Sequence, residues 1–323
     1  MQNIAILCSG GDVSGMNAAL KRFVEYSFVK GLTPYFIYNG YEGLIDNAIY
    51  EVGYKDVAGI IVNGGTKIRS SRSKRFMEDD YRKQAIDNLN KHKIDHLVVL
   101  GGDGSFKGMK KLSEESNGIR FCGIPATIDN DIAGTEYCLG VDTALNVIKD
   151  AIDSLRDTAS SFSRAFVVEV MGRDCGYLTL VSALTSGAEM CLIPEIPYDL
   201  DTYKDSFKKQ MNEGRTYFIA VVSEGLKNTA EIAEWFEKEI GIESRATVLG
   251  HIQRGGNPTV YDRLMAYDFV THAIDGMLGG NASSVVCYGK GGFNYTDIED
   301  VAFCKNHLKA ELLNLGLEFG NQR

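Results

Sequence analysis

The sequence lacks the features that mark membrane, disulfide-rich and nucleic-acid-binding proteins. No run approaches eighteen apolar residues, so no membrane span is expected. Its seven cysteines are odd in number, scattered and without a C-x-x-C pair, which favours buried free thiols over disulfides or zinc ligands. Acidic residues number 43 against 34 Lys and Arg, and the net charge of -9 argues against nucleic acid or an anionic membrane as a partner. The start, Met-Gln-Asn-Ile-Ala-Ile-Leu, lacks the basic segment and long apolar core of a signal peptide, so we expect a cytoplasmic protein.

Proline is also scarce, with five among 323 residues, and no low-complexity linker occurs. A chain of this length exceeds one ordinary core, so two domains with a compact junction are expected. Short apolar runs at residues 4–8, 97–101, 165–171 and 247–252 alternate with amphipathic patterns such as residues 16–29. This alternation predicts an α/β fold of mainly parallel sheets covered by helices on both faces, with ligands at the carboxyl ends of the strands.

The stretch IPATIDNDIAGT, residues 124–135, places Thr127, Asp129 and Asp131 two positions apart directly after an apolar run. In extended backbone these three side chains would share one face, so two carboxylates and a hydroxyl would occupy a small volume. Carboxylates that close disfavour each other's ionisation unless a cation or a proton lies between them. A metal or general-base site and a solvated turn with Asx-type hydrogen bonds are both open for this stretch.

Two glycine-rich loops follow predicted strands, LCSGGDVSGMNAA at residues 7–19 and VVLGGDGSFKGMKK at residues 98–111. Neither fits the Walker A pattern or G-x-G-x-x-G, and strand-to-helix turns favour glycine in any case. Two such loops in one sheet nevertheless favour phosphate binding, because glycine allows close backbone approach to a helix start that attracts anions. Asp103 in the second loop suits a helix N-cap, but acidic residues on another strand end favour a Mg²⁺ ion there.

Cations flank two predicted strands of the second half. Arg164 and Arg173 bracket one strand, and Arg245 precedes another that is followed by His251 and Arg254. Singly such arginines are usually solvated, but together they suit a second phosphate. Arg164 and Arg173 stand too far apart for one phosphate, so they serve different sites or one reaches a neighbouring subunit. Phosphate-binding loops, carboxylates suited to Mg²⁺ and a second anion site are the features needed for phosphoryl transfer to a phosphorylated acceptor. One carboxylate would take the proton of the acceptor hydroxyl.

Five segments together resemble the signatures of the bacterial-type ATP-dependent 6-phosphofructokinase family: SGGDVSGMNAA, GGDGS, TIDNDIAGT, VVEVMGRDCG and ATVLGHIQRGG. GGDG alone is weak, since NAD kinases and diacylglycerol kinases carry it too, but the match runs in order from residue 4 to about residue 288. The resemblance implies two Rossmann-like domains, with residues 1–140 plus 253–303 binding ATP and Mg²⁺ and residues 141–252 plus 304–323 binding fructose 6-phosphate. It further implies a homotetramer with shared active sites that performs the committing step of glycolysis.

The resemblance also assigns roles to individual residues. Asp129 would take the proton from the sugar 1-hydroxyl, Asp103 would hold Mg²⁺, and Asp131 would assist the metal or orient Asp129. Arg164 and Arg245 would reach a neighbouring subunit's site. Thr127 and Arg173 would stabilise the transferring phosphoryl group. The positions implied for ATP are Gly11, Tyr41, Arg72, Ser73, Gly102, Asp103, Gly104, Ser105 and Gly108. Those implied for fructose 6-phosphate are Thr127, Asp129, Arg164, Met171, Gly172, Arg173, Glu224, Arg245, His251 and Arg254.

Two departures from the family pattern bear on donor and regulation. The pyrophosphate-dependent branch has Asp where this chain has Gly104 and Lys where it has Ala126, so ATP is favoured, although Ala126 replaces the usual glycine. At the effector site two expected cations have become carboxylates and one a tyrosine, which predicts weak or absent regulation by ADP and phosphoenolpyruvate. The matching effector positions are Lys21, Glu25, Tyr54, Arg156, Glu213 and Arg215.

Three other functions compete with this interpretation. A related enzyme could use pyrophosphate or another sugar phosphate, and a catalytically silent sensor could bind nucleotide or sugar phosphate. A catalytically silent protein would be expected to have lost its catalytic base, yet Asp129 and Arg173 are both present. A dinucleotide-dependent dehydrogenase is disfavoured by the misfit to G-x-G-x-x-G.

Overall fold

The computed structural model describes residues 2–281, 283–303 and 308–319. The chain divides into two units, the first formed from Met1–Thr143 with Arg254–Asn306 and the second from Ala144–Gln253 with His307–Arg323. These bounds differ by up to three residues from the predicted domain limits, one of which, at residue 304, lies outside the described residues. Which ligand each domain binds stays a prediction.

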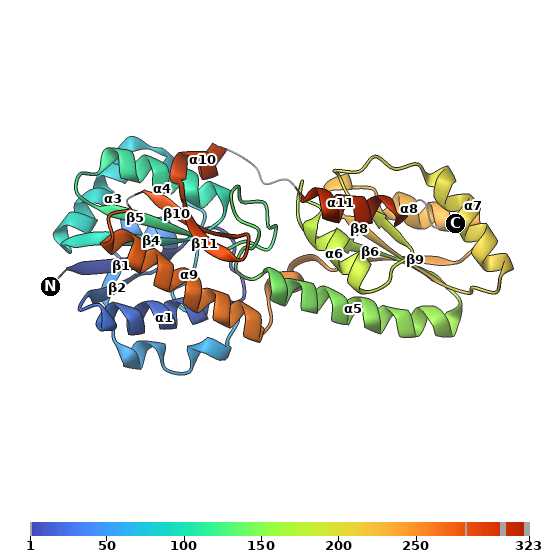
Figure 1. Ribbon diagram of the computed structural model, residues 1–323, viewed down its shortest axis with the longest axis horizontal. Coiled ribbons are helices and arrows are strands. Elements are labelled where there is room, and N and C mark those ends of the chain that lie inside the picture. Colours follow the sequence, from blue (N-terminus) through green and yellow to red (C-terminus); the bar gives the residue numbers. More distant parts are fainter. Residues whose placement is uncertain (1, 282, 304–307, 320–323) are drawn as a thin grey trace. The chain divides into compact units, whose positions relative to one another are not determined.

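The first unit contains a seven-stranded sheet in the order β11-β10-β5-β4-β1-β2-β3 (Figure 1). The five inner strands pair in parallel, whereas β3 and β11 at the two edges are antiparallel to their neighbours. Inner strands such as β1 and β4 are buried on both faces, which explains their continuous apolar runs. The strands are β1 (Asn3–Cys8), β2 (Thr33–Ile37), β3 (Ile49–Glu51), β4 (Ile94–Gly101), β5 (Arg120–Pro125), β10 (Ser284–Gly289) and β11 (Gly292–Asp297).

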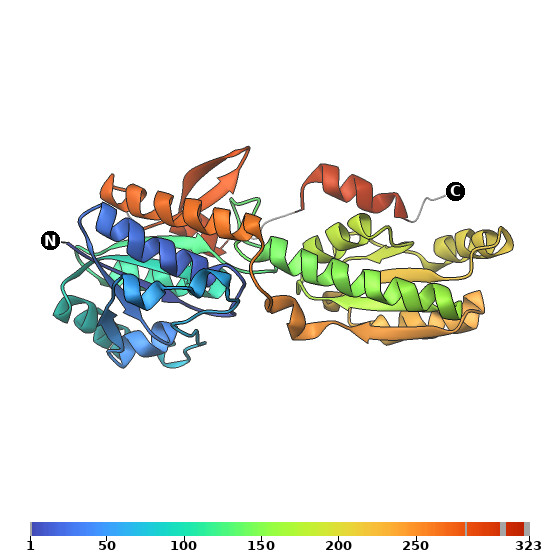
Figure 2. The same ribbon diagram turned by 90° about the horizontal axis from the view of Figure 1, so that it is seen from below.

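Helices cover both faces of this sheet (Figures 1 and 2). On one face α1 packs along α9, and on the other α4 packs with α3 and α10. Because α1 follows β1 and α4 follows β4, the loops that leave these neighbouring strands turn to opposite faces, the arrangement in which α/β sheets bind ligands. The helices are α1 (Met16–Val29), α2 (Gly40–Ile45), α3 (Asp79–Lys91), α4 (Asp103–Glu115), α9 (Val260–Leu278) and α10 (Ile298–Phe303), with short 3-10 turns η1 (Tyr54–Val57), η2 (Ile60–Val62) and η3 (Arg75–Met77).

The second unit has a four-stranded parallel sheet in the order β7-β8-β6-β9. Its core includes Phe207 of α7, which stacks on Phe218 of β8 and on Phe236 with ring centroids 4.5 and 5.5 Å apart. The strands are β6 (Ala165–Val170), β7 (Met190–Leu192), β8 (Phe218–Ser223) and β9 (Ser244–Val248). The helices are α5 (Val141–Phe162), α6 (Tyr177–Thr185), α7 (Leu200–Asn212), α8 (Thr229–Trp235) and α11 (Ala310–Leu317), with the 3-10 turns η4 (Glu224–Leu226) and η6 (Gly250–Arg254) and the π-helical segment η5 (Phe236–Ile240).

The predicted α/β architecture with mainly parallel, helix-covered sheets is confirmed. One predicted strand, residues 247–252, is wrong: β9 ends at Val248 and a 3-10 turn runs over Gly250–Arg254. Gly250 has a φ of 54°, a left-handed conformation that an extended strand cannot contain. The apolar residues of this stretch therefore continue past the end of the strand.

Two sequence-based expectations concern the cysteines and membrane spans. Six cysteines are described, and all are buried and free, as predicted; Cys304 lies outside the described residues. Burial raises the pKa of the Cys8 and Cys122 thiols to about 12, so they stay protonated at neutral pH. Within the described ranges, no helix has the length and apolar character needed to cross a bilayer.

His96 is a buried histidine in β4 whose environment predicts a pH-dependent stability. The side chain is 2% exposed, and neither ring nitrogen has a hydrogen-bond partner among the described residues. Burial, helped by the charge of Arg120, lowers the pKa of His96, while Asp95 acts in the opposite direction. The folded state therefore keeps the imidazole neutral at pH values where the unfolded chain, with a pKa of about 6.5, is already protonated.

We expect the protein to lose stability as the pH falls below about 6.5, by at most about 1.4 kcal/mol per pH unit from this group. The loss ends below the lowered pKa of the folded state, where both states carry the proton. Since His96→Leu lacks this titration, its melting midpoint should fall less than that of the wild type between about pH 7.5 and 5.5. Equal shifts of the two midpoints in scanning fluorimetry would contradict the prediction.

Candidate active site

Three loops that carry predicted site residues leave the carboxyl ends of neighbouring strands β5, β4 and β1. The Ser105 hydroxyl donates to the Ser9 carbonyl at 3.0 Å, which ties the loop after β4 to the loop after β1. The Ala126 amide donates to the Gly101 carbonyl at 2.9 Å, which ties the loop after β5 to the loop after β4. The structure thus brings the two glycine-rich loops and residues 127–131, here called the TIDND stretch, to one edge of the first sheet.

Two stacked aromatic rings, those of Tyr41 and Phe76, pack against the second glycine-rich loop and the start of α4. Tyr41 stacks on Phe76 with ring centroids 4.1 Å apart, and its hydroxyl donates to the Ser105 carbonyl at 2.7 Å. A Cβ at Gly108 would lie 3.0 Å from the Tyr41 ring and 3.3 Å from that of Phe76, so glycine lets α4 approach the two rings without displacing them. Gly104 has open space around it, and its backbone is exposed. Tyr41 therefore supports the loop, and Gly104 leaves it accessible.

The segment with Arg72 and Ser73 lies beside the first glycine-rich loop. The Gly10 amide donates to the Ser71 carbonyl at 3.2 Å, and the Ser70 hydroxyl donates to the Gly10 carbonyl at 2.7 Å. Arg72 is exposed next to this contact, and the Ser73 hydroxyl accepts a hydrogen bond from the Phe76 amide at 3.0 Å. An exposed arginine thus directly follows the residue whose backbone contacts the loop predicted to bind phosphate.

Asp103 is the first residue of α4, so its carboxylate lies at the positive end of a helix. It forms an ion pair of 2.9 Å with Lys107, one turn on, and both side chains are partly exposed. Among the described residues no group of three or more His, Cys, Asp or Glu side chains is arranged to hold a metal by itself. A magnesium ion here would therefore need phosphate oxygens in addition to carboxylates, which is the usual donor set for that ion. The exposed pair with Lys107 is too weak to prevent this.

The TIDND stretch is a turn, so the extended backbone expected there is wrong. Asn130 has a φ of 52°, which interrupts the alternation that was to place Thr127, Asp129 and Asp131 on one face. The solvated turn is wrong as well, because Thr127 and Asp129 are only 8% and 2% exposed. The Asp129 amide donates to the Thr127 hydroxyl at 3.3 Å, and a Cβ at Gly102 would lie 3.5 Å from the Thr127 Cβ. Thr127 therefore lies against the phosphate loop.

In the second unit, four predicted residues meet at the carboxyl ends of β6 and β8. The Glu224 carboxylate accepts hydrogen bonds from the amides of Gly172 and Arg173 at 3.2 and 3.0 Å. The Met171 amide donates to the Gln253 side chain at 3.1 Å. Gly172 and Arg173 have φ values of 141° and 55°, and this turn leaves the Arg173 side chain exposed. The carboxylate of Glu224 thus fixes the backbone that presents Arg173.

Arg164 and Arg245 lie together at the amino ends of β6 and β9. Arg164 directly precedes β6 and Arg245 is the second residue of β9, and the two strands pair in parallel with Phe166 opposite Arg245. Glu243 pairs with both, with the Arg164 Nε 2.8 Å from its carboxylate. A six-residue strand spans roughly 20 Å, so these two arginines cannot reach a ligand held by Arg173 of the same unit.

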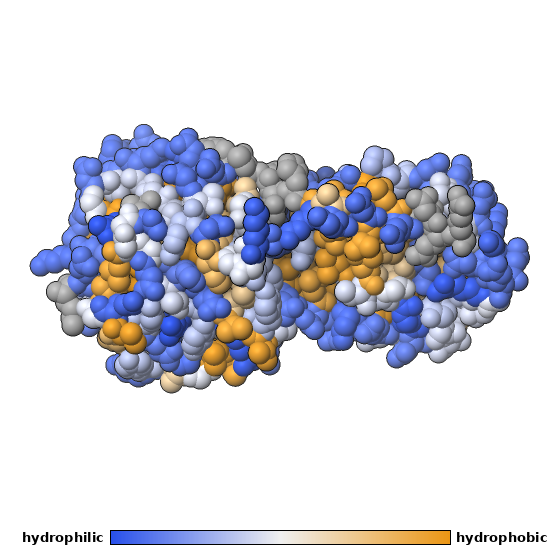
Figure 3. Space-filling model, in the orientation of Figure 1, coloured by the Kyte–Doolittle hydropathy of each residue, from blue (hydrophilic) through white to orange (hydrophobic). Residues whose placement is uncertain are grey.

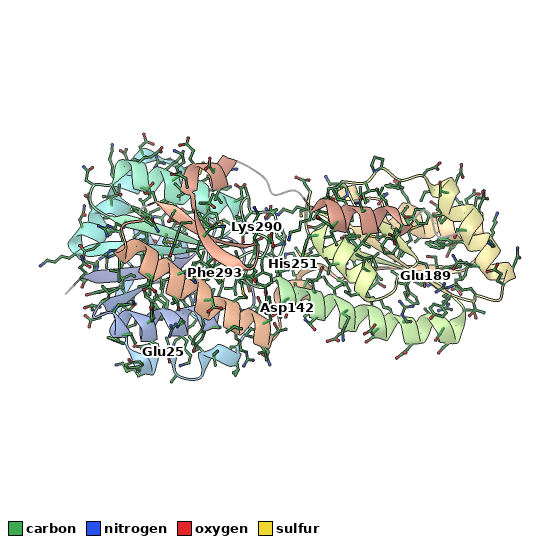
Figure 4. All side chains as sticks on the ribbon, in the orientation of Figure 1. Glu25, Asp142, Glu189, His251, Lys290 and Phe293 are labelled. Atoms are coloured by element: carbon green, nitrogen blue, oxygen red, sulfur yellow. The ribbon has the colours of Figure 1, made fainter. Side chains whose placement is uncertain are left out.

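His251 and Arg254 were predicted to hold one phosphate, and they fall in different units. His251 follows β9 in η6 and is exposed (Figure 4). Arg254 packs on the first glycine-rich loop, where a Cβ at Gly11 would lie only 2.4 Å from its guanidinium. A side chain at position 11 would displace the end of the Arg254 side chain, and the joint role of His251 and Arg254 stays a prediction.

A family model of phosphofructokinase matches residues 3–277. The chain belongs to the phosphofructokinase family. It is similar to the ATP-dependent 6-phosphofructokinase of Sulfurovum sp. (strain NBC37-1), with 71% identity over 99% of this chain and 98% of that one. The ATP-dependent 6-phosphofructokinase of Sulfurimonas denitrificans is 66% identical over 97% and 98% of the two chains.

Solved phosphofructokinase structures share the fold. The phosphofructokinase of Saccharomyces cerevisiae superposes with a TM-score of 0.87 and 30% identity, over 93% of this chain and 44% of the longer yeast chain. A pyrophosphate-dependent phosphofructokinase from Marinobacter aquaeolei gives a TM-score of 0.84 at 19% identity, over 99% and 91% of the two chains. At that identity the likeness shows the fold alone.

The predicted effector positions Arg156 and Arg215 of the second unit contact a buried carboxylate. Glu189, labelled in Figure 4, is 4% exposed and pairs with Arg215, while Arg156 lies 4.0 Å from the same oxygen. Its other oxygen accepts a hydrogen bond from the Ile219 amide at 2.7 Å. Burial raises the pKa of Glu189, and the Ile219 amide and both arginines act in the opposite direction. Glu213, which ends α7, is exposed.

The predicted effector positions of the first unit also have partners within the chain. Lys21 forms an ion pair with Glu25, and the second Glu25 oxygen accepts a hydrogen bond from the Tyr267 hydroxyl at 3.3 Å. Tyr54 is exposed and packs on the Phe28 ring at 5.0 Å. Each effector cation therefore already faces a carboxylate of its own unit.

Sequence reasoning missed four residues that organise these sites: Asn130, Glu189, Glu243 and Asp262. Asn130 lies inside a recognised motif and could have been noticed as an asparagine suited to a left-handed turn. Asp262 completes the pattern Thr-x-x-Asp at the start of α9, which predicts a helix cap but not the contacts that the side chain makes. The partners of Glu189 and Asp262, and the Arg164 partner of Glu243, are distant in sequence, so spacing alone could not identify these contacts.

Proposed function

We propose that this chain transfers the γ-phosphoryl group of ATP to the 1-hydroxyl of fructose 6-phosphate, giving fructose 1,6-bisphosphate and ADP. The observation that carries the proposal is its 71% identity, over nearly the whole of both chains, to an ATP-dependent 6-phosphofructokinase. The loops at the ends of β1, β4 and β5 agree with it, because they combine phosphate-binding backbone with a buried carboxylate. ATP and sugar phosphates are cytoplasmic metabolites, so the proposal places the protein in the cytoplasm.

Asp129 acts as the general base in this proposal. The acceptor hydroxyl must lose its proton as the new P–O bond forms, and a carboxylate within hydrogen-bond reach can take it. Asp129 is buried at the end of β5, where little water competes with the hydroxyl. The Thr127 hydroxyl, against the phosphate loop, and Arg173 would donate to the phosphoryl oxygens as charge develops on them.

Asp103 and Asp131 fit a magnesium ion brought with ATP. Asp103 offers a partly exposed carboxylate beside the glycine-rich loop, and Asp131 is a half-buried carboxylate two residues from the base. When bound, Mg²⁺ would neutralise charge on the β- and γ-phosphates. The backbone of residues 102–105 and the exposed Arg72 would hold the phosphate chain at the start of α4.

The acceptor site is proposed to be shared between subunits of a homotetramer. Met171, Gly172, Arg173 and Glu224 would hold the sugar at the carboxyl ends of β6 and β8, with His251 and Arg254 on the 6-phosphate. Because Arg164 and Arg245 lie at the other end of β6 and β9, they would serve a neighbouring subunit. Figure 3 shows apolar surface over α6 and α11, where Leu315 and Leu317 are 44% and 51% exposed, which supports association.

The proposal is tested by measuring turnover with ATP and with pyrophosphate in parallel, using fructose 6-phosphate or a second hexose phosphate as acceptor. We expect turnover with ATP and fructose 6-phosphate alone. Turnover with pyrophosphate alone would overturn the donor assignment, and preference for the second sugar would overturn the acceptor. Binding of both substrates without turnover would favour the silent sensor.

We expect ADP to activate this enzyme weakly or not at all, and phosphoenolpyruvate to inhibit it weakly. A phosphate ligand would have to displace Glu189 from Arg215 and Arg156, and Glu25 from Lys21, before it could use those cations. The carboxylates left behind would then repel it. Fructose 6-phosphate saturation curves recorded with and without each ligand test this, and a clear shift of the curve would contradict it.

A further inference from the structure

The turn that carries Asp129 is braced across its interior by Asn130. This side chain is 2% exposed, and its φ of 52° is one that asparagine tolerates better than most residues. Its Oδ1 accepts a hydrogen bond from the Cys138 amide at 2.9 Å, and its Nδ2 donates to the Glu136 carbonyl at 3.2 Å. One amide therefore joins the outgoing and returning arms of the loop formed by residues 126–139.

The returning arm is itself fixed to the rest of the first unit. The Glu136 amide donates to the Tyr288 carbonyl of β10 at 2.7 Å, and the Leu139 amide donates to the Pro125 carbonyl of β5 at 2.9 Å. Between them, the Tyr137 hydroxyl donates to the buried carboxylate of Asp262 in α9 at 2.6 Å. Asn130 thus connects the Asp129 turn to an arm that is held by two strands and a helix.

We propose that Asn130 is a positioning residue that holds Asp129 in place for proton abstraction. This inference rests on the proposed function and adds a residue to it. Asp129 precedes Asn130 in the chain, so the two share a peptide plane, and the Asn130 amide limits how that plane can rotate. Proton transfer needs the base within hydrogen-bond reach, and a misplacement of about 1 Å can cost about a hundredfold in rate.

Asn130→Gly tests the side chain without straining the backbone, because glycine adopts a φ near 52° readily. We expect kcat to fall about 10- to 100-fold, while KM for ATP and for fructose 6-phosphate changes by less than about threefold. Asn47→Gly is the matched control, since Asn47 has a φ of 60° and its side chain contacts His92 in a different loop. Wild-type kcat in Asn130→Gly, or an equal fall in Asn47→Gly, would overturn the proposal.

A double-mutant cycle separates positioning of the base from a general structural role. If Asn130 acts through Asp129, adding Asn130→Gly to Asp129→Asn should lower the residual kcat by less than about threefold. A fall by the same factor as in the wild-type background would overturn the proposal. Wild-type enzyme that fails to phosphorylate fructose 6-phosphate in this assay would instead overturn the proposed function.

Asn130→Asp supplies a second readout in case the glycine variant does not fold. Aspartate has nearly the size of asparagine and keeps the acceptor for the Cys138 amide. It loses the Nδ2 donor to the Glu136 carbonyl, so kcat should fall while KM for ATP and for fructose 6-phosphate changes by less than about threefold. Wild-type kcat in Asn130→Asp would overturn the proposal.

Discussion

Asp129→Asn should lower kcat by about two to four orders of magnitude, while KM for ATP and fructose 6-phosphate changes little. Asparagine has the shape of aspartate but cannot accept the proton of the sugar hydroxyl. Asp129 is 2% exposed, so bulk water cannot readily replace it as the proton acceptor. The measurement is steady-state kinetics at saturating Mg²⁺ and ATP, and more than about a tenth of wild-type turnover would contradict the role.

Asp131→Asn is the informative companion variant, because Asp131 is the neighbouring carboxylate with the proposed metal-side role. We expect its activity to recover in part as Mg²⁺ is raised, since a weakened metal site can be filled by mass action. Asp129→Asn should not recover, because a metal ion cannot replace the lost base. If raised Mg²⁺ restored activity to Asp129→Asn but not to Asp131→Asn, Asp131 would be the base and Asp129 the metal-side carboxylate.

The inner strands of both sheets could be predicted because parallel strands buried on both faces read as continuous apolar runs. The edge strands β3 and β11 were not predicted, because most of their side chains are exposed. In β11 most side chains are exposed, and β3 has one buried residue among three, so neither carries a continuous apolar signal. Figure 1 shows β11 at the edge of the sheet, where antiparallel pairing with β10 defines it.

The candidate site was predictable as a set of residue types and much less as geometry. Glycines and carboxylates at strand ends indicated phosphate and metal chemistry, and Gly108 proves to admit the rings of Tyr41 and Phe76. The periodicity argument failed at Asn130, because one left-handed residue changes the direction of every side chain after it. Contacts between segments 125 residues apart, such as Tyr137 with Asp262, leave no local pattern to read.

Asp262 is expected to be the polar side chain on which the stability of the first unit depends most. It is fully buried, and its carboxylate accepts hydrogen bonds from the Tyr137 hydroxyl at 2.6 Å and the Gly140 amide at 2.7 Å. It also accepts from the Thr143 amide at 2.8 Å and the Thr143 hydroxyl at 2.5 Å. Thr259, which caps α9, donates through its hydroxyl to Asp142 at 2.5 Å and through its amide to the Thr143 hydroxyl at 3.1 Å, so the starts of α9 and α5 are also joined here.

Asp262→Asn should lower the free energy of unfolding by about 3 to 5 kcal/mol. The change removes the charge, and the NH₂ group of asparagine would face N–H and O–H groups that themselves need an acceptor. For a unit of this size this loss of stability corresponds to a fall in the melting midpoint of roughly 6 to 20 °C. Asp275→Asn is the matched control on the same helix, since Asp275 is 41% exposed and pairs with Lys30 at 2.8 Å. It should cost less than about 1 kcal/mol, because exposed ion pairs contribute little. Similar midpoints for the two variants would show that Asp262 does not hold the loop and α9 together.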